Sequence, residues 1–176
     1  SVEGAIDAGV DHVSAYSLIV EDGTPLARRV RRGELPAPDD DVAAARYGIG
    51  DRLLTDSGLS WYEVSNWARP GGECRHNLGY WHDDDWWGVG PGAHSHRRGE
   101  RWWNVKHPRT YADRLAAGES PAEDREVLTP DQRSMERVML GLRLSEGLAL
   151  ADLDDDARAR ASIEAREGLL DVAALD

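Results

Sequence analysis

Three stretches decide the fold: HVSAYSLIV at residues 12–20, DDDVAAARYGIGDRLLTDS at residues 39–57, and WYEV at residues 61–64. The first and third are rich in residues that favour strands, and a turn cluster, EDGTP, follows the first. The middle stretch begins with aspartates, which predict a helix N-cap and a favourable acidic first turn. Strand, helix and strand in this order predict an α/β unit with a parallel sheet. We expect the helix to bury one apolar face, made of Val42, Ala45, Ile49, Leu53 and Leu54.

Weaker patterns place further elements around this unit. Residues 2–9 predict the end of a helix that stops at Gly9, and residues 26–33 predict a short basic helix. Short strands are expected at residues 86–90, 101–105 and 169–173. Further helices are expected from the start signal Thr129-Pro130-Asp131 and over residues 154–167.

The order of these elements predicts two domains. Residues 1–120 are expected to form an α/β domain, and residues 121–176 a small helical or winged-helix-like domain. The apolar spacing of Val2, Ile6 and Val10 begins partway through a helical pattern, and the chain does not begin with methionine. We therefore expect it to be a piece of a longer protein.

The composition excludes several classes of protein. A net charge of −12 argues against nucleic-acid binding, because the phosphates would be repelled. Neither a signal peptide nor an apolar run of about 18 residues is visible, so we expect neither export nor a membrane span. The single cysteine cannot form an internal disulfide, which predicts a cytoplasmic protein.

Residues 61–107 are the chemically distinctive part of the chain, with all seven tryptophans and five of the six histidines. At the centre of this segment lies Cys74-Arg75-His76-Asn77-Leu78-Gly79-Tyr80-Trp81. A neutral imidazole among aromatic rings suits an axial ligand of haem iron. The alternative is that His76 is a hydrogen-bonded loop residue, and that the tryptophans fill core positions in a chain without phenylalanine.

Other features of this segment have plainer interpretations. Cys74 and His76 lack the second ligand pair of a structural zinc site. Four histidines are expected at the surface or in hydrogen bonds: His82, His94, His96 and His107. The run GVGPG at residues 88–92 matches no nucleotide-binding loop and predicts a tight turn in which the backbone approaches a neighbour closely. Five arginines are candidates to hold carboxylates such as porphyrin propionates: Arg69, Arg75, Arg97, Arg98 and Arg101.

Several ordered blocks together carry a family resemblance: HVSAYSL (12–18), EDGTP (21–25), YEVSNWARPG (62–71), CRHNLGYW (74–81) and GVGPGAH (88–94). The chain resembles the radical S-adenosylmethionine family of oxygen-independent coproporphyrinogen III oxidase-like proteins, and within it the haem-chaperone branch. The blocks cover residues 11–104, and the tail from Leu128 is similar to the C-terminal domain of that family.

The resemblance implies a partial (β/α) barrel that holds a [4Fe–4S] cluster and S-adenosylmethionine in the full-length protein. The cluster ligands of the family are three cysteines spaced C-x-x-x-C-x-x-C. This chain has Cys74 alone, so the resemblance implies the C-terminal half of the barrel. The resemblance also implies that two residues of the glycine turn lie near S-adenosylmethionine, Gly90 and Ala93.

The resemblance further implies a haem site and a function. The branch has a haem-binding motif, His-Asn-x-x-Tyr-Trp, with its histidine as the metal ligand; it falls on His76, Asn77, Tyr80 and Trp81. The implied function is that of a haem chaperone, which binds haem and delivers it to haem-dependent proteins. A membrane-associated acceptor and a homodimer are further expectations.

Two alternatives to the chaperone stay open. The first is an enzyme, an oxygen-independent coproporphyrinogen III oxidase that decarboxylates its substrate to protoporphyrinogen IX in haem biosynthesis. The second is that this segment alone is a structural remnant. No catalytic residue is assigned within the chain, and the sequence leaves open whether haem attachment is covalent.

Overall fold

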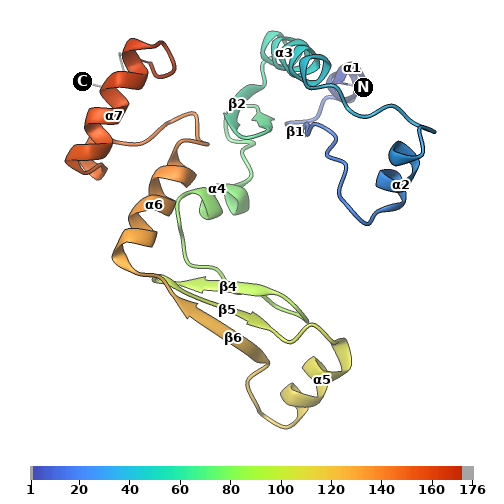
Figure 1. The fold of residues 1–176 in the computed structure, drawn as a ribbon, viewed down its shortest axis with the longest axis vertical. Coiled ribbons are helices and arrows are strands. Elements are labelled where there is room, and N and C mark those ends of the chain that lie inside the picture. Colours follow the sequence, from blue (N-terminus) through green and yellow to red (C-terminus); the bar gives the residue numbers. More distant parts are fainter. Residues whose placement is uncertain (1, 172–176) are drawn as a thin grey trace. The chain divides into compact units, whose positions relative to one another are not determined.

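The structure, a computed structural model, describes residues 2–171 and has a mixed α/β architecture (Figure 1). Its elements in chain order are α1 (Val2–Asp7), β1 (His12–Ser14), α2 (Pro25–Arg31), α3 (Asp40–Asp56), β2 (Ser60–Glu63), β3 (Asn66–Ala68), α4 (Arg75–Trp81), β4 (His94–Arg97), β5 (Glu100–Asn104), α5 (Pro108–Ala116), β6 (Ala122–Val127), α6 (Pro130–Gly141), the 3₁₀ helix η1 (Leu150–Asp152) and α7 (Asp155–Arg166).

The chain divides into two compact units, Ser1–Cys74 and Arg75–Asp176. Each unit contains one three-stranded sheet, β1-β3-β2 in the first and β4-β5-β6 in the second. The domain boundary that we expect between residues 120 and 121 stays a prediction. Strand β6 lies beyond this boundary and pairs with β5 before it.

The sheet of the first unit is antiparallel, so the prediction of a parallel sheet was wrong. Strands β1 and β2 run in the same direction, as the strand–helix–strand pattern requires, but they are not neighbours. The chain turns back after Glu63 and inserts β3 between them, with Trp67 opposite both Val13 and Trp61. The short third strand was missed because its three residues carry no alternation of their own.

The predicted strand at residues 12–20 is also shorter than expected. It ends at Ser14, because β3 offers three residues for pairing. The side chains that follow are exposed to solvent: Tyr16 by 68%, Leu18 by 65% and Ile19 by 74%. Their apolar character therefore does not reflect burial within this unit.

Helix α3 has the predicted ends but not the predicted inner face. The side chain of Asp39 accepts a hydrogen bond from the backbone N–H of Val42 at 2.9 Å and caps the helix. Of the predicted inner face, Leu54 is buried and Leu53 half-buried, whereas three residues are exposed: Val42, Ala45 and Ile49. The sheet is three strands wide and covers the C-terminal part of the helix, which explains the difference.

The core of the first unit forms where this end of α3 meets the sheet. Leu54, Leu59 and Trp67 make up a fully buried cluster. The indole Nε1 of Trp67 donates to Asp51 at 2.8 Å, which satisfies its polar atom inside the core. For Trp67, the prediction that a tryptophan fills an aromatic core position is confirmed.

A buried tyrosine links the sheet of the first unit to Cys74. The hydroxyl of Tyr62 lies 2.7 Å from Nε2 of His12 and accepts a hydrogen bond from the backbone N–H of Cys74 at 3.1 Å. Burial, and to a lesser degree the nearby carboxylate of Glu63, raises the pKa of Tyr62 above its ordinary value of 10.0.

This shift in pKa predicts a late-titrating tyrosine. The neutral phenol is favoured in the folded state, so its contribution to stability is complete below pH 10 and is lost as the pH rises through the pKa of the folded state. In an absorbance titration of tyrosinate, we expect one of the five tyrosines to ionise after the others, and Tyr62→Phe to remove that step. A Tyr62→Phe protein that keeps the late step would contradict the assignment.

The second unit contains an antiparallel meander, with α5 between β5 and β6 (Figure 1). The strand predicted at 101–105 is confirmed as β5. The strand predicted at 86–90 was wrong: of these residues, Trp86 alone makes a β-bridge, to His96, before the glycine turn begins. Residues 169–171 form no strand, and the other two residues of that prediction, 172 and 173, lie outside the described residues.

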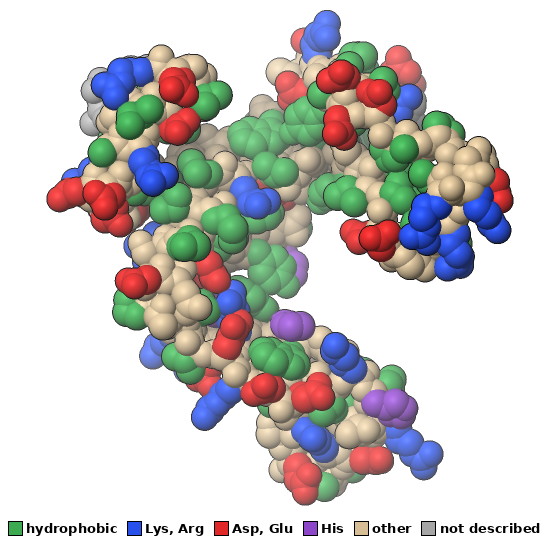
Figure 2. Space-filling view, in the orientation of Figure 1, with side chains coloured by type: hydrophobic (Ala, Val, Ile, Leu, Met, Phe, Trp, Pro, Cys, Tyr) green, Lys and Arg blue, Asp and Glu red, His purple; other side chains and the backbone are tan. Residues whose placement is uncertain are grey.

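The C-terminal helices of this unit follow their predicted start signals. Thr129 caps α6 in a capping box with Gln132, and Asp154 caps α7 through the backbone N–H of Ala157. The short basic helix also forms, as α2, and its basic side chains are visible at the surface (Figure 2). Ion pairs to Glu34 and Asp22 partly neutralise it. Within residues 2–171, no helix is both long and apolar enough to cross a membrane.

Candidate functional site

Helix α4 carries the four residues of the predicted haem motif. His76 and Tyr80 are one helical turn apart, so they share a face of the helix, and both are exposed, Tyr80 by 38%. Asn77 and Trp81 are half-buried. Among residues 2–171 the imidazole of His76 has no hydrogen-bond partner, so a ring nitrogen is accessible to a ligand from solvent.

Four rings in contact run from the surface into the second unit: His76, Tyr80, Trp86 and His96. We call them the aromatic ladder. The centroids of successive rings lie 4.7, 4.9 and 4.7 Å apart. The first two contacts are edge-to-face, at interplanar angles of 73° and 80°. This geometry is favourable for aromatic pairs, so the ladder holds Tyr80 between two rings.

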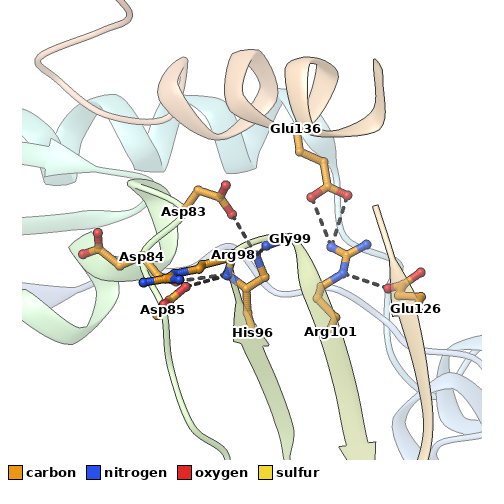
Figure 3. Close-up of polar contacts among 9 residues, drawn as sticks. All are labelled: Asp83, Asp84, Asp85, His96, Arg98, Gly99, Arg101, Glu126 and Glu136. Carbon is orange, nitrogen blue, oxygen red and sulfur yellow. Dashed lines mark hydrogen bonds and ion pairs between the residues drawn. The ribbon is translucent and has the colours of Figure 1, made fainter. Parts of the chain in front are cut away.

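His96 is the last ring of the ladder at its buried end, and Figure 3 shows its polar surroundings. Its side chain is 2% exposed, and its Nε2 accepts a hydrogen bond from the backbone N–H of Gly99 at 3.1 Å. Nε2 therefore carries no proton, and Nδ1–H donates to the carbonyl of Asp84 at 3.1 Å. Both ring nitrogens are used, and Oδ1 of Asp83 also lies 3.6 Å from Nε2. His96 is therefore structural, and the prediction that it is a hydrogen-bonded histidine is confirmed.

A small cavity lies beside the exposed end of the ladder. Its volume is about 200 Å³, and it is lined by Arg75, His76, Gly79, Tyr80, Asp84, Asp85 and Trp86. Sites that enclose a drug-sized ligand measure about 300–1,000 Å³. The cavity is therefore too small to enclose a porphyrin, and a ligand of that size would lie mainly on the open surface of α4.

Trp81 faces a different cavity from His76. The guanidinium carbon of Arg143 lies 5.4 Å from the centroid of its ring, a cation–π contact. A second cavity of about 590 Å³ is lined by Trp81 together with residues of α6 and the following loop, among them Arg133, Arg137 and Leu144. The structure thus brings His76 and Tyr80 together, and it turns Trp81 toward the C-terminal helices.

Gly90 and Ala93 lie in the tight turn before β4 and make none of the contacts of the aromatic ladder. The backbone N–H of Gly90 donates to the hydroxyl of Tyr111 at 3.1 Å, and its carbonyl accepts from Nδ2 of Asn104 at 2.9 Å. Ala93 accepts at its carbonyl from the backbone N–H of Asn104 at 2.9 Å. These bonds hold the turn against the second unit's sheet, and the placement of S-adenosylmethionine near it stays a prediction.

The glycine turn does approach a neighbour closely, as predicted. A Cβ atom on Gly88 would lie 2.0 Å from the carbonyl oxygen of His94, far inside any real contact. The Gly88 backbone is fixed there by hydrogen bonds to Ser95 and Asn104. Gly88 is therefore required by the close pairing of the two arms of the turn.

The arginines that were candidates for carboxylate binding have different surroundings. Arg101 is held by Glu126 and Glu136, at 2.7 and 3.1 Å (Figure 3). Arg69 belongs to the first unit, where its guanidinium lies 3.8 Å from Asp11. Arg75 is the one of the five that lines the cavity beside His76.

Sequence reasoning missed Trp86 and His96 as neighbours of the motif. Their contact depends on the bridge that pairs their backbones across the glycine turn. Among the described residues no group of three or more His, Cys, Asp or Glu side chains is placed to hold a metal ion. A metal bound at His76 would thus need most of its ligands from elsewhere, as haem iron obtains four from the porphyrin.

Two curated relatives that are similar to this chain carry the same name. Heme chaperone HemW of Mycobacterium tuberculosis is 59% identical over 171 residues, which cover 97% of this chain and 44% of that protein. Heme chaperone HemW of Bacillus subtilis is 34% identical over 85% of this chain and 39% of that protein. The chain thus spans less than half the length of these curated relatives. No family model matches it.

A solved structure supports the fold. The radical SAM enzyme coproporphyrinogen III oxidase (HemN) of Escherichia coli aligns with a TM-score of 0.70 and 20% sequence identity, covering 97% of this chain and 44% of that one. The resemblance stated from the sequence blocks and the fold class are both confirmed. The match lies in the C-terminal part of the relatives.

Proposed function

Because this chain belongs to the HemW family of radical S-adenosylmethionine proteins and matches the C-terminal part of its members, we propose that it serves as the haem-binding part of a haem chaperone. In this proposal His76 is the axial ligand of haem iron, and the protein delivers the haem to haem-dependent acceptors. The whole protein's activity and its acceptors are part of the proposal.

The observation that carries the proposal is the accessibility of the His76 imidazole. Its imidazole is exposed on α4 and has no hydrogen-bond partner among residues 2–171, and the ring of Tyr80 packs against it. A neutral imidazole next to aromatic surface suits ferric and ferrous haem, because the rings contact the porphyrin and the nitrogen binds the iron. In this proposal Arg75, which lines the adjacent cavity, binds a propionate.

The shape of the site favours transfer over permanent storage. The cavity of about 200 Å³ leaves most of a porphyrin on the surface of α4. A cofactor that a protein retains is normally buried over most of its surface. A haem held by one axial bond and an open aromatic surface is accessible to an acceptor protein.

This chain does not contain a complete binding site for the radical cofactors. Its single cysteine, Cys74, cannot supply the three thiolates of a [4Fe–4S] cluster. In the full-length protein we propose that the cluster and S-adenosylmethionine bind outside these residues, with the turn at Gly90 and Ala93 contributing to the latter. A membrane-associated acceptor, a homodimer and a cytoplasmic location stay predictions.

The proposal is tested by haem titration followed by transfer. We expect the chain to bind one haem saturably, with a Soret band that differs from that of free haem. We then expect the band to move to that of a haem-binding apoprotein, such as apomyoglobin, when the apoprotein is added. Absence of saturable binding would refute the proposal for this chain.

The alternative, coproporphyrinogen III oxidase activity, rests on the fold likeness to that enzyme. It is separated from the chaperone proposal by an anaerobic assay of the full-length protein with coproporphyrinogen III. We expect no protoporphyrinogen to form, because the relatives with the higher sequence identity carry the chaperone name. Sustained turnover would favour the oxidase.

A further inference from the structure

The aromatic ladder connects the motif to a residue outside it, Trp86. The indole of Trp86 is half-buried and lies between Tyr80, at 4.9 Å between centroids, and His96, at 4.7 Å. It also lines the small cavity beside His76. Trp86 thus contacts Tyr80, whose ring packs on His76, and it also lines the cavity next to His76.

The position of Trp86 is set by the fold and does not depend on a ligand. Its backbone N–H donates to the carbonyl of His96 at 2.9 Å, and its carbonyl accepts from the N–H of His96 at 3.0 Å. His96 is itself held at both ring nitrogens and is 2% exposed. Trp86 therefore presents a fixed ring to Tyr80.

Tyr80 and His76 lack comparable restraints of their own. Metal-binding histidines are usually oriented by a hydrogen bond at the second ring nitrogen, to a carboxylate, a carbonyl or water. No such partner is present for His76 within residues 2–171. Its orientation then depends on the edge-to-face contact with Tyr80, which in turn rests on Trp86.

We propose that Trp86 is a positioning residue of the haem site, which orients the imidazole of His76 through the ring of Tyr80. This inference rests on the proposed haem-binding function. In this proposal packed rings orient the ligating imidazole, whereas a hydrogen bond orients it in most histidine-ligated metal sites.

The test compares variants of Trp86 in the full chain loaded with haem. An aromatic pair contributes about 0.5–1.5 kcal/mol, so we expect Trp86→Ala to weaken haem affinity about twofold to thirteenfold. We also expect the Fe–His stretching frequency in resonance Raman spectra of ferrous haem to shift. Trp86→Phe, which keeps a ring, should restore both properties. Trp87→Ala is the matched control, since Trp87 packs on Trp102 outside the ladder.

Each outcome decides the inference. Trp86→Leu keeps most of the apolar volume without the ring, so it replaces the alanine variant if circular dichroism shows that the latter is unfolded. Unchanged haem affinity and an unchanged Fe–His frequency in these variants would overturn the inference. A loss of affinity without a spectral shift would also overturn it, and so would a loss that Trp86→Phe does not rescue. If His76→Ala also leaves haem binding unchanged, the proposed ligand fails, which is a separate result.

Discussion

Replacing His76 by alanine is expected to weaken haem binding by at least about 100-fold and to abolish the ligand-specific Soret band. Helix α4 carries no second histidine, so the iron would lose its proposed axial ligand. Loss of even an outer-shell partner costs about 10–100-fold in metal affinity, and a direct ligand is worth more. Absorbance titration measures both effects.

His107→Ala is the control for this experiment. His107 is exposed, and its side chain makes no capping hydrogen bond at the start of α5, so we expect unchanged haem binding. Exogenous imidazole should restore part of the spectrum of His76→Ala by occupying the vacated position on the iron. A His76→Ala chain that keeps the affinity and spectrum of the parent would show that another residue binds the iron.

Replacing Gly88 by alanine is expected to lower the free energy of unfolding by about 3 kcal/mol or more, because the new Cβ collides with backbone. The atom would lie 2.0 Å from the carbonyl oxygen of His94 and 2.7 Å from its carbonyl carbon. Neither can move without breaking the hydrogen bonds of Gly88 to Ser95 and Asn104. Urea denaturation followed by circular dichroism measures the change.

Gly48→Ala is the matched control, since a Cβ there meets nothing within 4 Å and the residue is inside α3. Alanine is favoured over glycine in a helix by about 1 kcal/mol, so this variant should be as stable as the parent or slightly more stable. Equal stability of Gly88→Ala and Gly48→Ala would mean that the arms of the glycine turn do not pair as described.

Helices α3, α6 and α7 were predictable because their start signals are local, whereas α4 and α5 were not predicted. The side chains of Asp39, Thr129 and Asp154 each accept a hydrogen bond from a backbone N–H three residues later, and that geometry is contained within the sequence. The buried face of α3 was not predictable in the same way. Val42 and Ile49 have the right spacing, but the sheet that would cover them is three strands wide.

The strands were harder to predict, because a strand exists only where another strand pairs with it. β1 stops at Ser14 since β3 is short, although the sequence continues with residues that favour strands. β6 carries the charged run AEDREV and forms a strand because β5 pairs with it. The sequence of β1 or of β6 does not show which strand will pair with it.

The sequence by itself determined the family, because ordered blocks such as CRHNLGYW are specific without any geometry. The haem motif within these blocks stays a prediction. The tertiary structure decided which motif residues act together. Helical spacing sets His76 and Tyr80 on one face, while Trp81 packs beneath Arg143. Trp86 and His96 lie next to the motif because their backbones pair across a glycine turn. The backbone hydrogen bonds of this pair join residues ten positions apart in the sequence.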